Sequence, residues 1–578
     1  MHEFTVWAPS AASVDLDLTG RRVPMSATGD GWWSLRVEEA GHGTDYLFSL
    51  DGADPVPDPR SAWQPEGVHG PSRVFDASRH SWDDTGWAGR DVRGAVLYEL
   101  HVGTFTAEGT FDAAHVRLDH LVTLGVDVVQ LMPVAAFPGR WGWGYDGVAL
   151  YAVHEPYGGP QALQRFVDAC HARGLAVSLD VVYNHLGPSG NYLHAFGPYF
   201  TDRHSTPWGQ AVNLDGADAE PVRRFVIDNA LRWLRDFHVD VLRLDAVHAL
   251  VDDSERHLLA QLSDETAALA RDLGRPLSLV AESDLNDAVM VRPTSRGGFG
   301  MTAQWDDDVH HALHALLTGE RQGYYADFGE MAALVKVLTD AFVHDGGWSS
   351  FREKHWGAPV DRAAVPGQAF LAYTATHDQV GNRAAGDRPS ATLTPGQSAI
   401  AAAVVLTGPF TPMIFMGEEW GAATPWQYFT DHQEAELADA IRQGRRREFS
   451  GTGWDAVEVP NPQDPATRDA SVLDWDEVTA QPHRRLLAWH RDLVALRRAE
   501  SELRDPRLDQ VRVDHDADQG WLVLRRGSLR VVCNLSPEPS TVPLDPAPST
   551  VVIGWDETVS DRDGVRLAGH SVAIVRVG

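Results

Sequence analysis

Short runs in which hydrophobic and polar residues alternate occupy the two ends of the chain. The first fifty residues contain FTVW, SVDLDL, GWWSLRV and DYLFSL, and the last part contains RLDQVRVD, GWLVLRR, SLRVVCNL and HSVAIVRVG. Alternation with a period of two is typical of strands that bury one face. We therefore predict a small β-sandwich at each end, over residues 1–90 and 501–578. The Pro- and Gly-rich segment 53–72 is predicted to be a loop.

The middle of the chain, residues 91–500, has a different pattern. Compact apolar runs alternate with amphipathic segments that have helical spacing and often end in Gly. The apolar runs are 95–103, 126–134, 175–185, 239–247, 277–283, 300–306, 368–378 and 409–419. Nearly continuous apolar strands indicate a parallel sheet covered by helices, and eight of them fit a (β/α)₈ barrel. A doubly wound sheet is the alternative, but no G-x-G-x-x-G motif follows the first strand.

Four of these predicted strands end in acidic or His-bearing clusters. The clusters are DVVYNH (180–185), RLDAVH (243–248), AES (281–283) and THD (376–378). The C-terminal ends of barrel strands meet on one face, which is where barrel enzymes hold their active sites. We therefore expect three carboxylates from three strand ends to converge there: Asp245, Glu282 and Asp378.

Crowded carboxylates are typical of glycoside hydrolysis. In that chemistry one carboxylate attacks the anomeric carbon while another, kept protonated, donates to the leaving oxygen. A neighbouring carboxylate raises the pKa of the acid, whereas a neighbouring Arg keeps the nucleophile ionised. Arg243 lies two residues before Asp245, so the two side chains share a face of the strand.

A metal site is a weaker interpretation of the same residues. The chain has no H-E-x-x-H and no C-x-x-C motif. His310, His311 and His314 have an H-H-x-x-H spacing, but they lack a neighbouring Glu base. The acidic segment 305–308 lacks the pattern of a calcium loop.

Aromatic residues support a sugar ligand. The Gly-rich loop 137–159 carries several aromatic rings, on which the apolar faces of sugars could stack, although such a loop could equally pack its own core. Of the 20 Trp residues, six follow predicted barrel strands and are expected on the active-site face. These are Trp141, Trp143, Trp208, Trp305, Trp420 and Trp426.

Composition excludes several classes of partner. The 578 residues include 49 Lys and Arg against 81 Asp and Glu, a formal net charge of −32. Nucleic acids and anionic membranes both require clustered cations, so neither is expected as a partner. No stretch approaches the roughly 18 apolar residues of a membrane span. The first residues lack the pattern of a signal peptide, and Cys170 and Cys533 are expected to be reduced core thiols, so we predict a cytoplasmic protein.

The four strand-end clusters, in this order, resemble the four signature regions of the α-amylase superfamily of glycoside hydrolases. The resemblance implies that Asp245 is the nucleophile, Glu282 the general acid and base, and Asp378 the carboxylate that stabilises the transition state. It also implies a set of substrate-binding residues in the matching motifs. They are Tyr145, Asp146, His185, Arg243, His248, His377, Gln379 and Asn382.

Longer segments resemble a narrower family, the malto-oligosyltrehalose trehalohydrolases. Among them are YELHVGTFTAEGTFDAA, GWGYDGVALYAVHEPYGGP and AQWDDDVHHALHALLTGE, and the resemblance runs from about residue 3 to 450. It implies an N-terminal immunoglobulin-like β-sandwich, a catalytic (β/α)₈ barrel and a C-terminal antiparallel β-domain. It further implies hydrolysis of the α-1,4 bond next to the terminal trehalose of malto-oligosyltrehalose, releasing trehalose and a maltodextrin. By the same match, Asp306, Asp308 and His310 are expected to hold the substrate.

Two alternatives remain at this stage. A glycogen branching or debranching enzyme of the same superfamily would share the N-terminal sandwich, although the segments after Asp245 and after His377 differ from those of branching enzymes. A non-catalytic glucan-binding protein would also fit the barrel, although all three carboxylates are present. The short segment 186–220 differs from the large calcium-binding domain of other amylases, so we expect no required metal and no cofactor. The resemblance implies a malto-oligosyltrehalose synthase as the pathway partner.

Overall fold

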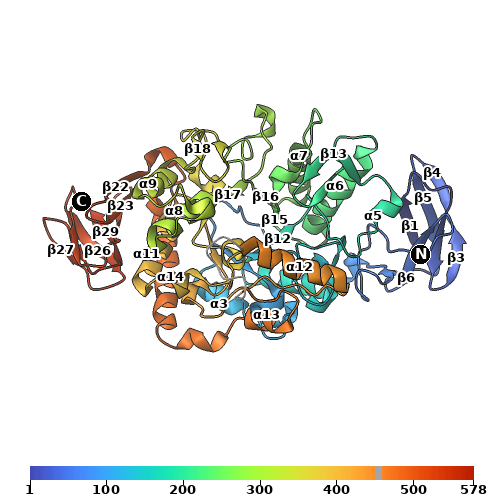
Figure 1. Cartoon of the computed structure of the whole chain (residues 1–578), viewed down its shortest axis with the longest axis horizontal. Coiled ribbons are helices and arrows are strands. Elements are labelled where there is room, and N and C mark those ends of the chain that lie inside the picture. The colour runs from blue at the N-terminus through green and yellow to red at the C-terminus, as the bar shows by residue number, and fades with distance from the viewer. Residues whose placement is uncertain (450–458) are drawn as a thin grey trace.

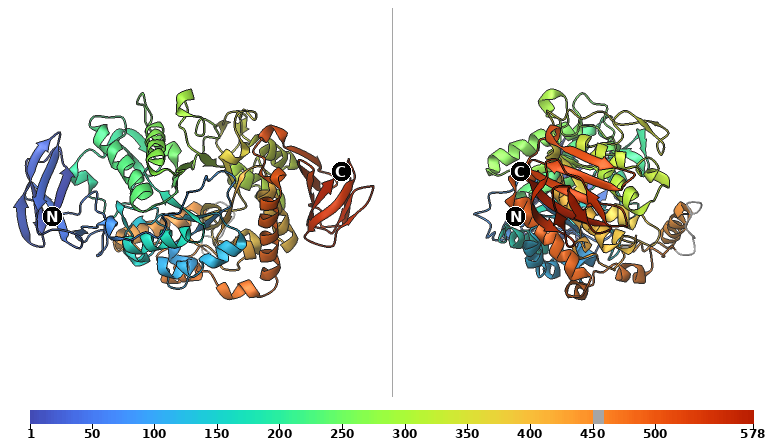
Figure 2. Two further views of the ribbon diagram at one scale, coloured as in Figure 1. Left: turned by 180° about the vertical axis from the view of Figure 1, so that it is seen from behind. Right: turned by 90° about the vertical axis from the view of Figure 1, so that its left-hand side faces the viewer.

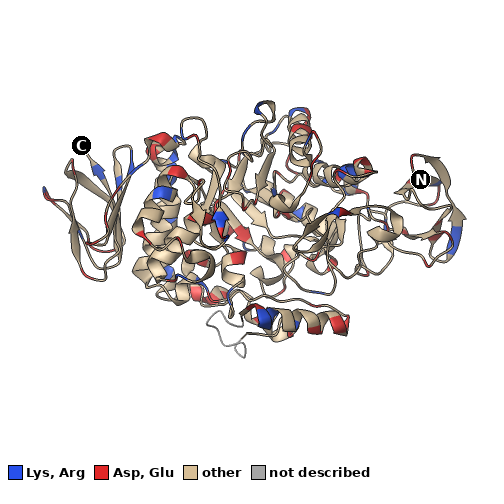
Figure 3. Cartoon of the chain, turned by 45° about the horizontal axis from the view of Figure 1, so that its top comes forward, with Lys and Arg blue, Asp and Glu red and all other residues tan. Residues whose placement is uncertain are grey.

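The computed structural model describes residues 1–449 and 459–578. The molecule is elongated, with the N-terminal sheets at one end, the C-terminal sheets at the other and a barrel with its helices between them (Figures 1 and 2). The two predicted β-rich ends therefore lie far apart. In the view of Figure 3, acidic and basic residues are interspersed along the helices.

The centre of the molecule is a closed barrel of parallel strands. Its strand order is β12–β15–β16–β17–β20–β21–β8–β9, and every residue of these strands is buried. Each predicted apolar run contains one of the strands, so the predicted (β/α)₈ barrel is confirmed. The strands are β8 (Leu97–Leu100), β9 (Val128–Leu131), β12 (Ala176–Val181), β15 (Val241–Leu244), β16 (Ser278–Ala281), β17 (Ala303–Trp305), β20 (Phe370–Tyr373) and β21 (Thr411–Phe415).

Amphipathic helices cover the outside of the barrel. In α4, residues three or four apart such as Leu163, Phe166, Val167 and Cys170 are buried, as helical periodicity requires. Several helices end at a glycine in the left-handed region, for example Gly319 with φ 80°. The longer helices are α4 (Gly159–His171), α6 (Ala219–Asp236), α7 (Leu258–Leu273), α8 (Asp307–Thr318), α9 (Met331–Asp340), α11 (Pro395–Thr407), α12 (Ala435–Phe449) and α14 (His483–Ala499).

Shorter elements follow the strands on the face where the strands end. Three antiparallel hairpins lie in these connections. They are β10 (Ala135–Ala136) with β11 (Ala149–Val153), β13 (Phe200–Thr206) with β14 (Gly209–Val212), and β18 (Trp348–Ser349) with β19 (Lys354–His355). The short helices are α1 (Val102–Phe105), α2 (Phe111–His115), α3 (Leu118–Leu124), α5 (Leu193–Phe196), α10 (His377–Gly381) and α13 (Pro465–Ala470).

Two antiparallel sheets pack together at the N-terminus, as predicted. The rings of Phe4 and Tyr46 meet between the sheets with centroids 4.8 Å apart. Trp7 packs against Tyr199 of the barrel region, which attaches this end to the centre. The first sheet contains β1 (His2–Trp7), β5 (Trp32–Val37) and β4 (Ser26–Gly29), and the second contains β3 (Arg21–Pro24), β2 (Val14–Leu18), β6 (Asp45–Leu50) and β7 (Ser72–Arg73).

The C-terminal region also forms two antiparallel sheets, which share a core with Val523, Val542 and Val575. One sheet contains β22 (Arg512–Asp516), β23 (Trp521–Arg526), β24 (Leu529–Asn534), β29 (Ser571–Val577) and β26 (Pro548–Gly554), and the other contains β25 (Ser540–Val542), β28 (Val565–Leu567) and β27 (Val559–Ser560). Both cysteines are buried and free, as expected. Among the described helices, none is long and apolar enough to cross a membrane.

Candidate active site

A cleft of about 710 Å³ opens on the face where the barrel strands end. Asp245, Glu282 and Asp378 all line it, although they come from the ends of β15, β16 and β20. The barrel therefore brings together the three carboxylates that were predicted to converge. Aromatic residues form other parts of its wall, namely Trp143, Tyr145, Phe200, Trp208 and Tyr428.

Arg243 is the electrostatic centre of the site. It lies on β15 with a fully buried side chain, and its guanidinium packs over the ring of Trp305. Nη1 donates to Asp245 Oδ1 at 2.9 Å, and Nη2 lies 2.7 Å from Glu282 Oε2. Because one guanidinium contacts both groups, the carboxyl groups of Asp245 and Glu282 are close to each other.

The carboxyl groups of Asp245 and Glu282 have different surroundings. Asp245 accepts hydrogen bonds from Arg243 and from Asn184 Nδ2. Burial raises the pKa of Glu282; Arg243 opposes this shift and the charge of Asp245 adds to it. The arrangement therefore favours a protonated carboxyl group at Glu282, which is what a general acid needs.

The backbone after Asp245 takes part in the site. Ala246 adopts φ 37° and ψ 51°, a left-handed conformation that is uncommon for a residue with a Cβ. In this conformation its N–H donates to Glu282 Oε2 at 2.8 Å. The strained residue thus helps to hold Glu282 beside Asp245.

Asp378 belongs to a second charged group on the other side of the cleft. His377 Nδ1 lies 2.9 Å from Glu99 Oε1, and its Nε2 lies 3.6 Å from Asp378 Oδ2. Burial opposes the charged form of His377, but Glu99 and Asp378 outweigh it and raise the pKa of His377 to about 9. His377 is therefore a cation at neutral pH.

Tyr145 connects the two charged groups. Its Oη lies 2.7 Å from His377 Nε2 and donates to Asp180 Oδ2 at 2.7 Å, and Asp180 in turn accepts from Arg243 at 2.6 Å. Gly144 precedes it with φ 100°, and a Cβ there would lie 2.4 Å from the carbonyl oxygen of Pro133. Only glycine fits this turn, which presents Tyr145 to the cleft.

The remaining predicted cleft residues lie in or beside the cleft. His185 and His248 line it, as does Asp146. The ring of Trp208, half exposed at the β13–β14 hairpin, stacks on His185 with centroids 4.7 Å apart. Two more predicted residues donate hydrogen bonds to neighbouring carboxylates. Asn382 Nδ2 donates to Asp378 Oδ1, and Gln379 Nε2 donates to Asp307 Oδ1.

The structure contradicts direct sugar contacts for Asp306, Asp308 and His310. Their exposed fractions are 1 %, 3 % and 1 %. Asp308 accepts from backbone N–H groups of Val343 and His344, and His310 contacts the Thr374 carbonyl. These residues therefore lie in the interior, in the connection after β17, and not on the surface of the cleft. The prediction placed them by motif alone and did not consider which side of α8 faces the cleft.

Asp307, which the sequence did not single out, is the exposed member of the same segment. One further residue, Glu99, was missed as a site component, and Asp180 was named only as part of the strand-end cluster 180–185. Glu99 and Asp180 are fully or almost fully buried carboxylates within barrel strands, and they pair with His377 and Arg243. A signal was available, because a charged residue in an otherwise apolar barrel strand needs a buried partner of opposite charge.

Four of the six Trp residues predicted on the active-site face are buried, namely Trp143, Trp305, Trp420 and Trp426. Trp420 and Trp426 have an exposed fraction of 0 %, and Trp305 lies beneath Arg243. Trp143 and Trp208 do line the cleft, and Trp143 stacks on Trp426. Trp305, Trp420 and Trp426 therefore belong to the interior and not to the cleft wall.

A cluster of possible metal ligands lies outside the cleft. Within the described residues, His204, Asp215 and Asp253 are close enough for one cation, whereas the H-H-x-x-H residues form no such group. Asp215 already interacts with Arg203 at 3.1 Å, with His204 at 2.9 Å and with the N–H of Asp253.

Because protein groups already interact with the carboxylate of Asp215, we expect a chelator to leave the predicted glycoside hydrolase activity unchanged. The test compares initial rates of sugar release before and after dialysis against EDTA. A loss of rate that Ca²⁺ restores would contradict the expectation.

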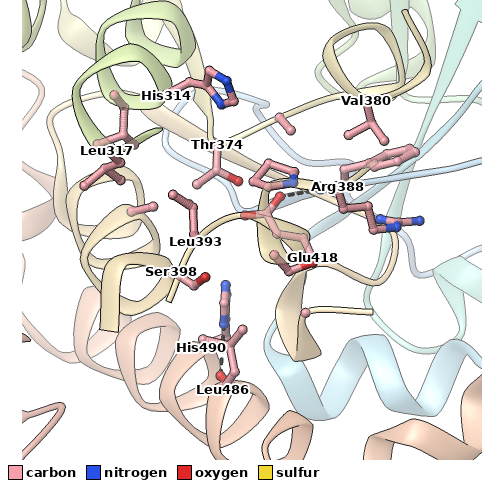
Figure 4. A pocket seen from close by; sticks show the side chains of 17 residues that line it. His314, Leu317, Thr374, Val380, Arg388, Leu393, Ser398, Glu418, Leu486 and His490 are labelled. Carbon is pink, nitrogen blue, oxygen red and sulfur yellow. Dashed lines mark hydrogen bonds between the residues drawn. The ribbon is translucent and has the colours of Figure 1, made fainter. Parts of the chain in front are cut away.

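A second cavity lies behind the catalytic face, between α8, α11 and α14 (Figure 4). It measures about 50 Å³ and is lined largely by apolar side chains such as Leu317, Val380 and Leu486. In Figure 4 the ring of His490 points into it from α14. Its small volume excludes an oligosaccharide, so the large cleft is the candidate active site.

Comparisons with known proteins agree with this geometry. The model of the alpha amylase catalytic domain matches residues 72–201, and the model of a domain of unknown function, DUF3459, matches residues 506–574. The crystal structure of a putative alpha amylase from Salmonella typhimurium superposes with a TM-score of 0.91 at 37 % identity, covering 100 % of this chain and 97 % of that one. A 1,4-alpha-glucan branching enzyme of Vibrio parahaemolyticus is 31 % identical over 54 % of this chain and 48 % of its own length.

Relatives over the whole length share one name. Malto-oligosyltrehalose trehalohydrolase of Arthrobacter ramosus is 55 % identical, covering 99 % of both chains. The protein of the same name from Mycobacterium tuberculosis is 53 % identical over 100 % of this chain and 99 % of its own. The barrel, its three converging carboxylates and these full-length matches together show that the chain belongs to the malto-oligosyltrehalose trehalohydrolase family, within the α-amylase family of glycoside hydrolases.

Proposed function

We propose that the protein is a retaining glycoside hydrolase that cleaves the α-1,4 bond next to the terminal trehalose of malto-oligosyltrehalose. The observation that carries the retaining mechanism is the contact of Arg243 with both Asp245 and Glu282. Carboxyl groups bound to one guanidinium can approach each other closely enough for direct attack by one of them, whereas an inverting enzyme needs space for a water molecule between them.

The first step forms a covalent glycosyl-enzyme. Asp245 attacks the anomeric carbon while Glu282 protonates the oxygen of the departing trehalose. Asp378 and the cationic His377 stabilise the positively charged, oxocarbenium-like sugar together with Tyr145, whose hydroxyl group both charged clusters orient.

The second step releases the maltodextrin. Glu282, now ionised, removes a proton from a water molecule that attacks the anomeric carbon bound to Asp245. Glu282 regains its proton in this step. The enzyme returns to its starting state with no metal or cofactor in either step.

The substrate follows from the names of the relatives. A malto-oligosaccharide with a trehalose end must come from an enzyme that converts the reducing-end linkage, so we propose a malto-oligosyltrehalose synthase as the pathway partner. A neutral polymer also suits a chain with a net charge of −32, because it needs no cationic surface for steering.

We expect free trehalose and maltotriose, in equal amounts, as the products from maltotriosyltrehalose. Chromatography of the products with purified enzyme, and with the Glu282→Gln protein as a control, is the measurement. Release of glucose or of maltose as the main product would overturn the proposed bond specificity.

Branching or debranching activity is the second candidate. Its support is the shared superfamily and the partial match to a branching enzyme. Amylopectin separates the candidates: new or lost α-1,6 linkages, followed by NMR, would favour branching or debranching. Under our proposal the α-1,6 content stays unchanged.

A further inference from the structure

Three consecutive aspartates begin α8, and the helix directs them to different sides. Asp306 and Asp308 are buried, whereas Asp307 is exposed to solvent. Asp307 Oδ1 accepts hydrogen bonds from the hydroxyl group of Tyr373 and from Gln379 Nε2, at 3.1 Å for the latter. Among the described residues, no donor contacts Oδ2. One oxygen of Asp307 is therefore held by the protein, and the other is available to a ligand.

The donors that hold Asp307 are themselves rigid. Tyr373 is fully buried on β20. Gln379 is fixed by a capping box at the start of α10, where its Oε1 accepts from the N–H and the hydroxyl group of Thr376. The same short helix carries Asp378. The position of Asp307 is thus tied to the loop that bears one of the three proposed catalytic carboxylates.

The barrel order places Asp307 on a particular side of Glu282. Asp245 follows β15, Glu282 follows β16 and Asp307 follows β17, and these strands are neighbours in that order. Asp307 therefore lies on the side of the general acid that is away from the nucleophile. The glycosyl unit attacked by Asp245 occupies one side of Glu282, and the unit that leaves occupies the other.

We propose that Asp307 determines specificity by accepting a hydroxyl hydrogen from the sugar that leaves, and so favours a trehalose end over an ordinary reducing end. This inference rests on the proposed function. A carboxylate with one free, solvent-facing oxygen is a strong acceptor for sugar hydroxyl groups. A misplaced or missing hydroxyl group would leave that oxygen without a partner, which is how a polar site discriminates between ligands.

Asp307 also acts on its neighbours through charge. Desolvation by the surrounding protein raises the pKa of Asp307 to about 7. The hydrogen bond from Tyr373 opposes this shift, and the charges of Glu282 and Asp378 add to it. The buried Asp306 and Asp308 and the hydroxyl group of Tyr324 are further titratable neighbours.

The influence is reciprocal, so a negative charge on Asp307 raises the pKa of Glu282. The other groups that interact with Glu282 include Arg243, Asp245, His377 and the N–H of Ala246, and also Asp378 and Tyr373. Loss of the charge on Asp307 would therefore lower the pKa of the general acid, and the alkaline limb of activity would move to lower pH.

The test is the Asp307→Asn protein. An Asn side chain keeps an oxygen for Tyr373 and Gln379, so the fold is preserved, but it loses the charge and the free acceptor. We expect kcat/KM on maltotriosyltrehalose to fall by about 10- to 100-fold, the usual range for a hydrogen bond to a charged group. On maltopentaose, which has the same number of glucose units, we expect a change of less than about threefold, and the alkaline limb should shift to lower pH.

Two further variants are measured beside Asp307→Asn. Asp119→Asn removes an exposed carboxylate of α3, paired with Arg173, and should leave both substrates unaffected. Asp307→Glu keeps the charge but misplaces the oxygen, so the alkaline limb should stay as in the wild type while the preference for the trehalose end is reduced.

Equal losses of kcat/KM on both substrates, or an unchanged alkaline limb in Asp307→Asn, would overturn the inference. Thermal unfolding of each variant is measured first, and Asp307→Glu replaces Asp307→Asn if the latter is unfolded. Trehalose release by the wild-type protein is a separate measurement, so failure of the proposed function is distinguishable from failure of the role of Asp307.

Discussion

The Asp245→Asn protein is expected to lose at least about four orders of magnitude in kcat, the scale seen when a catalytic nucleophile is removed. An amide cannot form the glycosyl ester, but its single oxygen can keep the hydrogen bond from Arg243, and only the bond from Asn184, which goes to the other carboxylate oxygen, is lost. The fold should therefore survive. Initial rates of trehalose release, with circular dichroism to confirm folding, measure the effect.

The Glu282→Gln protein should behave differently, because the need for proton donation by Glu282 depends on the leaving group. With maltotriosyltrehalose, loss of the proton donor should lower kcat by about 10²- to 10⁴-fold. With α-maltosyl fluoride, whose leaving group needs no proton, the first step should proceed in Glu282→Gln and fail in Asp245→Asn.

The matched control is Glu265→Gln on α7, which removes a carboxylate paired with Arg224 outside the cleft. It should keep the wild-type rate. Near-normal turnover of either cleft variant, or equal behaviour of both with the fluoride, would refute the assigned roles.

Replacement of Arg243 by Met is expected to lower both stability and activity strongly. The guanidinium is the cation nearest to Asp180, Asp245 and Glu282, and removal of one partner from a buried charged group costs about 3–5 kcal/mol. Burial raises the pKa of Asp180 to about 7 even with Arg243 opposing the shift. Without Arg243, which lowers the pKa of both Asp180 and Glu282, the pKa values of these two carboxyl groups rise further.

The stability loss should therefore depend on pH. A carboxyl group whose folded-state pKa is raised destabilises the fold at pH values above its unfolded pKa, and this penalty disappears as the pH falls and the group is protonated in both states. The deficit in the free energy of unfolding should thus be larger at pH 8 than at pH 5. Urea unfolding curves of wild type and variant at the two pH values measure it.

Arg497→Met is the matched control. Arg497 is equally buried, but it donates to the carbonyl oxygens of Leu406, Gly408 and Phe410 and, within residues 1–449 and 459–578, to no carboxylate. Its replacement should destabilise the protein by a similar amount at both pH values and leave kcat unchanged. If the two Met variants show the same pH dependence, the electrostatic role of Arg243 is refuted.

Much of the fold was predictable because it depends on local patterns. Nearly continuous apolar runs such as 126–134 and 239–247 predicted barrel strands, since a parallel strand is buried on both faces. The barrel then required that Asp245, Glu282 and Asp378, at the ends of such strands, meet on one face.

Predictions that depended on the direction of a side chain were less successful. Asp306, Asp308 and His310 were placed in the cleft by motif, but the first turn of α8 directs only Asp307 to solvent. Trp420 and Trp426 were placed there by their position after β21, but the chain folds both into the core. Adjacent residues of a helix point about 100° apart, so a shift of one position decides between burial and exposure.

The sequence by itself determined the barrel, the β-rich ends and the three strand ends that carry the carboxylates, because hydrophobic periodicity follows local backbone geometry. Only the tertiary structure decided which partners set the charge of each group. Arg243 reaches Asp180, Asp245 and Glu282 together, and Glu99 holds His377 as a cation across 278 residues of chain. Such contacts join residues from different strands. The distances that set their energies exist only once the barrel has closed.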